Sequence, residues 1–256
     1  MATAINSPHH RFSNVKALIF DLMGTCTNWN TTIVAAIEAD KILANILSPD
    51  EQLQLASDWR QGFFREIHTH FRNKLPQEDI DITHKRVLDH LLESKGIGFT
   101  TYGENERNLL VRAWHEQKAW SDAIKAISQL KTKMMVVVLA NGTTRLQLDI
   151  IRSSGLPFHT LFSSQLLGFT KPAPEIYHKA LSLLEIEPNQ AVMVAAHAYD
   201  LRAAKKMLGL KTAYIYRDTE DLDEEMDLVK NEVDLFFRGA KNNPLEELSD
   251  FLLKST

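Results

Sequence analysis

Four short runs of the chain are continuously apolar, the pattern of strands that are covered on both faces of a parallel sheet. Segments with the hydrophobic spacing of helices separate the later runs, at 143–155, 173–186 and 200–210. This alternation predicts a doubly wound, Rossmann-like α/β fold with a parallel sheet. The four expected strands are Val15–Phe20, Met134–Ala140, Ala191–Ala196 and Thr212–Tyr216.

The stretch between the first two expected strands has a different pattern. From 28 to 114 the apolar residues recur at helical spacing, and no strand-like run interrupts them. A long insertion of one structural type after a first strand indicates a separate small domain. We therefore expect a helical cap domain at 28–114, inserted into an α/β core domain that is formed by 1–27 and 115–256.

The composition of the 256-residue chain is that of a globular protein. Hydrophobic residues make up 44%, the net charge is −4, and the basic residues form no long run. The single cysteine, Cys26, rules out an intrachain disulfide and fits a reducing compartment. The polar N-terminus lacks a signal-peptide core, and no run approaches the about 18 to 20 apolar residues of a membrane span. We expect a cytoplasmic protein without nucleic-acid or membrane partners, and a solvated acidic stretch at 218–227.

Polar side chains stand at the ends of the expected strands, where open α/β sheets place their active sites. The residues at these ends and in the loops beside them are Asp21, Thr25, Asn141, Lys171, Tyr177, His197 and Asp200. They include a candidate nucleophile, Asp21, a cation, Lys171, and a second carboxylate. Because the carboxyl ends of parallel strands meet at one edge of the sheet, we expect these groups to converge.

Four motifs in this order resemble those of the haloacid dehalogenase superfamily. They read "FDLMGT", "LANGT", "KPAPEIY" and "VAAHAYD", and the resemblance covers most of the chain. It implies a Rossmann-like core with an aspartate nucleophile at Asp21. The helical insertion at 28–114 matches the cap that this superfamily places after its first motif.

The position two residues after the nucleophile separates the branches of the superfamily. Phosphatases carry an Asp there, which protonates the leaving alkoxide. This chain has Met23, which cannot transfer a proton. We place Met23 among the substrate-binding residues. Phosphatases also commonly hold Mg²⁺ with an acidic pair in motif four, where this chain has Ala196 and Asp200. Asp21 and Asp200 would hold Mg²⁺ only weakly, so we expect no essential metal or other cofactor. A Mg²⁺-dependent phosphatase is kept as an alternative.

The better match is the type II 2-haloacid dehalogenase branch, which uses no metal and tolerates a non-acidic residue at this position. Its cap carries a Trp-Arg pair, and this chain has Trp59-Arg60. The resemblance implies that Asp21 displaces a halide from a small molecule through an aspartyl ester, and that Arg60 faces the halide or the substrate carboxylate. The other matched residues are Thr25, Lys171 and Asp200, which surround the nucleophile, and Asn141 and Tyr177, which line the pocket. Related dehalogenases are often dimers, which makes a homodimer one expected assembly.

The same residues make chemical sense without the resemblance. A carboxylate nucleophile must be ionised and aimed, and a nearby Lys171 ammonium favours the charged form of Asp21. Thr25 can hold one carboxylate oxygen, and a guanidinium such as that of Arg60 presents several donors to an anion. An ester intermediate needs water, which Asp200 or His197 could orient.

Three positions depart from the dehalogenase pattern. Ala140 and Ala195 stand where hydroxyl residues are usual, and His197 replaces an Asn. The lost hydroxyls weaken binding of a small carboxylate and open a second interpretation. Similar enzymes of fungal natural-product pathways, as in quinolone alkaloid assembly, act on larger, less polar epoxides, which a protonated Asp21 or His197 could activate as general acid. A non-catalytic ligand-binding protein is the third alternative.

Overall fold

The structure, a computed structural model, describes residues 8–73, 75, 78–239 and 243–255. The chain divides into an α/β unit, Met1–Thr27 with Ala119–Thr256, and a helical unit, Asn28–Lys118. The helical unit contains Trp114, as expected, which is buried against aromatic rings of the same unit, and it extends to Lys118. The residues 1–7 of the polar N-terminus, for which we expect no signal peptide, lie outside the described residues.

Parallel strands form the sheet of the α/β unit in the order β5-β4-β1-β6-β7-β8, as the doubly wound fold requires. β5 and β8 are not among the four apolar runs, because these edge strands are short and only partly buried. The strands are β1 (Ala17–Phe20), β4 (Met135–Ala140), β5 (Thr160–Ser163), β6 (Ala191–Ala195), β7 (Lys211–Ile215) and β8 (Leu235–Phe237). Two further strands, β2 (Thr27–Asn28) and β3 (Lys118–Ala119), pair separately where the chain passes between the units.

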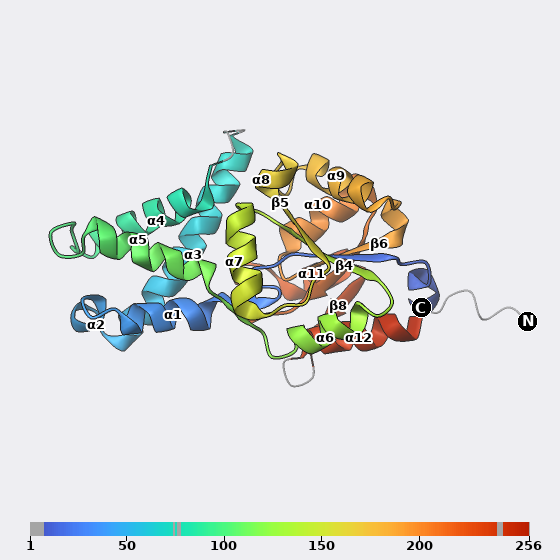
Figure 1. The fold of residues 1–256 in the computed structure, drawn as a ribbon, viewed down its shortest axis with the longest axis horizontal. Coiled ribbons are helices and arrows are strands. Elements are labelled where there is room, and N and C mark those ends of the chain that lie inside the picture. Colours follow the sequence, from blue (N-terminus) through green and yellow to red (C-terminus); the bar gives the residue numbers. More distant parts are fainter. Residues whose placement is uncertain (1–7, 74, 76–77, 240–242, 256) are drawn as a thin grey trace, which may run out of the picture. The chain divides into compact units, whose positions relative to one another are not determined.

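Helices cover both faces of this sheet (Figure 1). On one face a buried cluster joins Ile19 of β1 and Met193 of β6 with Ile176 of α9 and Leu201 of α10. On the opposite face α6 packs on β4, and α12 packs on β7 and β8. The helices of this unit are η1 (Pro8–Phe12), α6 (Ala123–Leu130), α7 (Thr144–Ser154), α8 (Ser164–Leu167), α9 (Pro174–Leu184), η3 (Pro188–Gln190), α10 (Ala198–Leu208), α11 (Met226–Glu232) and α12 (Pro244–Ser255).

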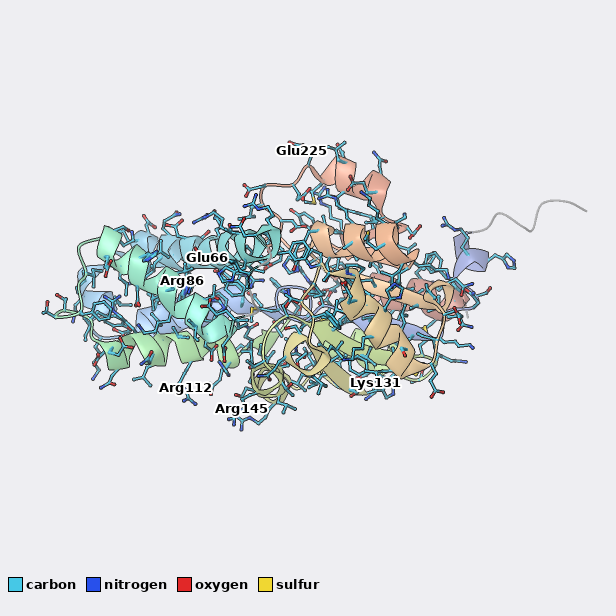
Figure 2. All side chains as sticks on the ribbon, turned by 90° about the horizontal axis from the view of Figure 1, so that it is seen from above. Glu66, Arg86, Arg112, Lys131, Arg145 and Glu225 are labelled. Carbon is cyan, nitrogen blue, oxygen red and sulfur yellow. The ribbon has the colours of Figure 1, made fainter. Side chains whose placement is uncertain are left out.

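In its described part, the helical unit is all-helical between 29 and 117, as predicted from the hydrophobic spacing. Its long helix α3 begins with a capping box: the Ser48 hydroxyl accepts from the Glu51 amide, and the Glu51 carboxylate accepts from the Ser48 amide at 2.8 Å. α3 packs on α1 and α4, and Arg86 of α4 pairs with Glu66 of α3 at 3.2 Å (Figure 2). The helices are α1 (Trp29–Ala39), α2 (Leu43–Ile46), α3 (Pro49–Arg72), α4 (Ile80–Ser94), α5 (Glu104–Arg112) and η2 (Ala113–His115).

The strand order positions the functional residues. β1 lies between β4 and β6. β4 and β5 are added on one side of β1, and β6, β7 and β8 on the other, so β1 marks the switch point where such folds bind ligands. The carboxyl ends of these three strands lead into Asp21, Asn141 and Ala196. Among the described residues, no helix combines the length and the apolar composition that crossing a membrane requires.

Candidate active site

The turn after β1 carries Asp21 and depends on Gly24. The Asp21 amide still donates to Val194 of β6 at 2.9 Å, so the backbone follows the sheet up to this residue. Gly24 has φ +83°, and a Cβ atom there would lie 2.5 Å from the carboxyl carbon of Glu220. The glycine is therefore needed both for the left-handed backbone and for the space that the Glu220 carboxylate occupies.

Lys171 lies between two carboxylates. Its Nζ donates to Asp21 Oδ1 at 2.8 Å and to Asp200 Oδ2 at 2.5 Å, and the side chain is 1% exposed. Burial opposes the charged form of Lys171, but the two carboxylates outweigh it and raise its pKa. The expected convergence of nucleophile, cation and second carboxylate is present in the structure.

The pKa of Asp21 lies far below its usual range. Burial alone would raise this pKa, but the charge of Lys171 and the hydrogen bond from His197 favour the carboxylate and dominate. The Thr25 hydroxyl donates to Asp21 Oδ2 at 2.7 Å, and itself accepts from the Ala196 amide at 2.9 Å. Asp21 is therefore ionised at neutral pH and fixed at both oxygens.

Asp200 and Tyr177 form the support behind Lys171. Asp200 stands in the first turn of α10 and is fully buried, and the Tyr177 hydroxyl donates to its Oδ1. Burial and the neighbouring Asp21 charge raise the pKa of Asp200, against the opposing effect of Lys171. The contact of Tyr177 is thus to Asp200, and its expected place in the substrate pocket stays a prediction.

Asn141 acts on the backbone of Lys171. Its side-chain amide donates to the Lys171 carbonyl at 3.1 Å, and its carbonyl oxygen accepts from the Lys171 amide at 2.8 Å. This pair of bonds fixes the loop that carries the lysine. Contact between Asn141 and a substrate stays a prediction.

His197 bridges Asp21 and a carboxylate that the sequence did not indicate. Its Nδ1 lies 3.1 Å from Asp21 Oδ2, and its Nε2 lies 2.8 Å from Glu220 Oε2. Burial opposes protonation of the ring, but the bonds to Asp21 and Glu220 outweigh it and raise the pKa of His197 to about 10. The ring is an imidazolium at neutral pH and donates to both carboxylates.

The prediction that the whole acidic stretch 218–227 is solvated was wrong. Glu220 is 4% exposed, and Asp221 accepts from the Ala198 amide at the start of α10 at 2.6 Å. The stretch turns inward because two donors at the start of α10 face it, the His197 imidazolium and the Ala198 amide. Nothing in the run of similar side chains distinguishes Glu220 from its exposed neighbours, and sequence reasoning missed it for that reason.

The carboxylates of this site do not fit Mg²⁺. This ion needs several oxygen ligands in octahedral geometry. The Lys171 ammonium already lies between Asp21 and Asp200, and Tyr177 takes the other Asp200 oxygen. Across the described ranges, no group of three His, Cys, Asp or Glu side chains is arranged to hold a metal ion.

Three predicted residues remain, one in the turn after β1 and two in the helical unit. Met23, in the turn after β1, forms a β-bridge with Thr27. Trp59 and Arg60 belong to α3 of the helical unit, where the Trp59 indole donates to the His84 carbonyl at 2.8 Å. The Arg60 guanidinium lies over the Phe64 ring, 4.4 Å from its centroid. Roles of these three residues in substrate binding stay predictions.

The chain is similar in sequence to known dehalogenases. The sequence model of the haloacid dehalogenase-like hydrolases matches residues 15–207. (S)-2-haloacid dehalogenase 4A of Burkholderia cepacia is 26% identical over 246 residues, which cover 94% of this chain and 96% of that protein. (S)-2-haloacid dehalogenase 1 of Pseudomonas sp. strain CBS-3 is 27% identical over 208 residues, or 79% and 85% of the two chains.

Solved structures of the same kind superimpose on the chain. The L-2-haloacid dehalogenase PA0810 has a TM-score of 0.79 and 29% identity, and the match covers 94% of this chain and 99% of that one. The defluorinating L-2-haloacid dehalogenase Rha0230 has a TM-score of 0.81 and 29% identity over 93% and 95%. With a family match over most of its length and the expected fold, this chain belongs to the haloacid dehalogenase-like hydrolases.

Proposed function

We propose that the protein is a metal-independent hydrolase of the 2-haloacid dehalogenase type. In this reaction the Asp21 carboxylate attacks the halogen-bearing carbon, the halide leaves, and water hydrolyses the resulting aspartyl ester. The observation that carries the proposal is the state of Asp21: an ionised carboxylate, held by a buried ammonium, a hydroxyl and an imidazolium. A carboxylate nucleophile needs that combination of charge and fixed aim.

The hydrogen bonds indicate which oxygen attacks. Oδ2 accepts from both Thr25 and His197, so its two lone pairs are engaged. Oδ1 accepts from Lys171 and keeps one lone pair for the carbon. In this proposal Oδ1 becomes the ester oxygen and Oδ2 the ester carbonyl, where Thr25 is placed to stabilise the charge that develops during hydrolysis.

The relatives support the reaction class, because both are named for 2-haloacids and match most of the chain. We assign Arg60 to the halide or the substrate carboxylate, and the helical unit to the role of a cap. A guanidinium packed on aromatic rings is weakly hydrated and suits an anion of this size.

The test is halide release from (S)- and (R)-2-chloropropionate, with and without EDTA. We expect turnover of one enantiomer that EDTA leaves unchanged and that Asp21→Asn abolishes without loss of the folded state. Single turnover in ¹⁸O-water should label the peptide that contains Asp21. Absence of halide from every short 2-haloacid, with the wild type folded, would contradict the proposal, and phosphate release that EDTA stops would favour the phosphatase.

One observation favours a second function, acid-assisted opening or rearrangement of an epoxide on a larger apolar substrate. The His197 imidazolium beside Asp21 is a proton donor that a simple displacement does not use. An aryl epoxide is the probe. This function predicts product without ¹⁸O in the Asp21 peptide, and a loss of rate in His197→Gln, whereas labelled Asp21 from a haloacid favours the dehalogenase.

A further inference from the structure

Glu220, His197 and Asp21 form a continuous buried chain of hydrogen bonds. The three side chains come from the loop after β7, the residue before α10 and the end of β1. Their exposed fractions are 4%, 3% and 7%. The two ring nitrogens of His197 are both engaged, one on each carboxylate. A carboxylate that orients an imidazole beside a reacting group is the arrangement of an oriented general base.

Glu220 is held in this position by its own surroundings. The Thr219 hydroxyl donates to Glu220 Oε1 at 3.0 Å, and the missing side chain of Gly24 makes room for the carboxylate. The preceding Arg217 fixes the loop, with bonds to the Thr25 carbonyl at 3.2 Å and to Asp122 at 2.9 Å. The loop is thus tied to the same turn that carries the nucleophile.

The charge of Asp21 controls what His197 can do. While Asp21 is a carboxylate, the ring lies between two anions and keeps its proton, so it cannot accept another. An aspartyl ester is neutral, and its formation removes one of those two anions. Of the other nearby charged groups, Lys171 disfavours the protonated ring, while Glu220 and Asp221 favour it. The Tyr199 ring lies 5.9 Å from the His197 ring. Burial then favours the neutral imidazole.

We propose that His197, oriented by Glu220, is the general base that activates water for hydrolysis of the Asp21 ester, and that ester formation itself enables this role. Glu220 is the positioning residue. It accepts the hydrogen bond from Nε2–H, so the unprotonated nitrogen of the neutral ring is Nδ1, which faces the ester. Nδ1 contacts Oδ2, one bond from the carbon that water attacks. This inference rests on the proposed dehalogenase-type reaction and concerns its second half.

The protons balance. In the first half, a bond forms between Oδ1 and the substrate carbon, and the halide leaves with the electron pair; His197 then releases one proton to solvent. Nδ1 next takes a proton from the attacking water and gives it to the product alkoxide as the tetrahedral intermediate collapses. The regenerated Asp21 carboxyl group returns a proton to His197. The complete reaction converts an organic halide and water into an alcohol, a halide ion and one proton.

The experiment compares the two half-reactions in His197→Gln, Glu220→Gln and a matched control. With 2-chloropropionate in single turnover, intact-protein mass spectrometry follows the ester and ion chromatography follows halide. We expect the halide burst to persist in both site variants, while ester hydrolysis slows by about 10²-fold or more in His197→Gln and less in Glu220→Gln. Glu225→Gln changes an exposed carboxylate of the same acidic stretch (Figure 2) and should leave both half-reactions unchanged.

Ester that hydrolyses at the wild-type rate in His197→Gln would overturn this inference and leave the dehalogenase intact. Wild-type enzyme that forms neither ester nor halide would overturn the proposed function instead. A nitrogen-15 NMR titration of His197 tests the charge argument in either case. The pKa should fall from about 10 in Asp21→Asn and in Glu220→Gln, and an unchanged pKa in both variants contradicts the inference.

Discussion

At the scale of single residues, the site is a balance of buried charges. Asp21, Asp200 and Glu220 face the two cations Lys171 and His197, and each contact between them is a direct hydrogen bond. Buried charges of this kind are tolerated only when each is paired, because removal of one partner leaves the other desolvated. Individual substitutions should therefore affect stability and ionisation together.

Replacement of Lys171 by Met should show both effects. Asp21 and Asp200 lose their shared cation, so we expect the stability to fall by about 3–5 kcal/mol. The pKa of Asp21 should rise, because burial then acts with less opposition, and the acid limb of the pH–rate profile should move to higher pH. Urea unfolding and a pH profile measure these changes. Lys206→Met, an exposed lysine of α10, is the control, and equal losses in both variants would contradict the pairing argument.

Replacement of Gly24 by Ala tests the turn under Asp21. The positive φ and the close Glu220 carboxylate should together cost about 1–3 kcal/mol and displace Glu220 from His197. Gly98→Ala meets no atom within 4 Å and serves as the control. Chemical denaturation measures the difference, and we expect ester hydrolysis to slow only in Gly24→Ala. A Gly24 variant as stable and active as the control would refute this account of the turn.

At the scale of elements, the apolar runs predicted the four central strands but not the edges of the sheet. β1, β4, β6 and β7 are covered on both faces, which makes them continuously apolar. β8 is three half-buried residues, too short for such a run. The site followed the same rule: Asp21 and Lys171 were predictable from strand ends and motifs. Glu220 lies in a loop after β7, where only the folded chain shows which carboxylate turns inward.

The start of α3 gives a prediction at this scale. Ser48→Ala removes the hydroxyl that caps the helix, and we expect the helical unit to lose about 0.5–2 kcal/mol. Ser48→Asn retains a capping oxygen and should restore most of that loss. Denaturant unfolding followed by circular dichroism compares the three proteins. Equal stability of wild type and Ser48→Ala would show that the capping box contributes nothing measurable.

At the scale of the whole molecule, the site should shape the dependence of stability on pH. The pKa of His197 is raised to about 10 in the folded protein, against about 6.5 in an unfolded chain. Its contribution is therefore fully present below pH 6.5 and is lost as pH rises to 10. The lowered pKa of Asp21 contributes stability above its unfolded value, and this contribution is lost in strong acid.

In His197→Gln the decline of the unfolding free energy between pH 6.5 and 10 should be shallower, as urea titrations at several pH values would measure. An unchanged slope would mean that the ring is neutral in the folded protein.

The burial of Cys26 limits the reaction of this protein with electrophiles. Cys26 is the only thiol of the chain, fully buried, and its Sγ lies 3.4 Å from the Asp21 carbonyl. Burial and the nearby Asp21 charge raise its pKa, so the sulfur stays protonated. Alkylating agents, which include haloacids, react with the thiolate. In the proposed reaction, an electrophile that enters this protein would therefore meet an oxygen nucleophile whose adduct water can remove, and no accessible thiol on which a permanent thioether could form.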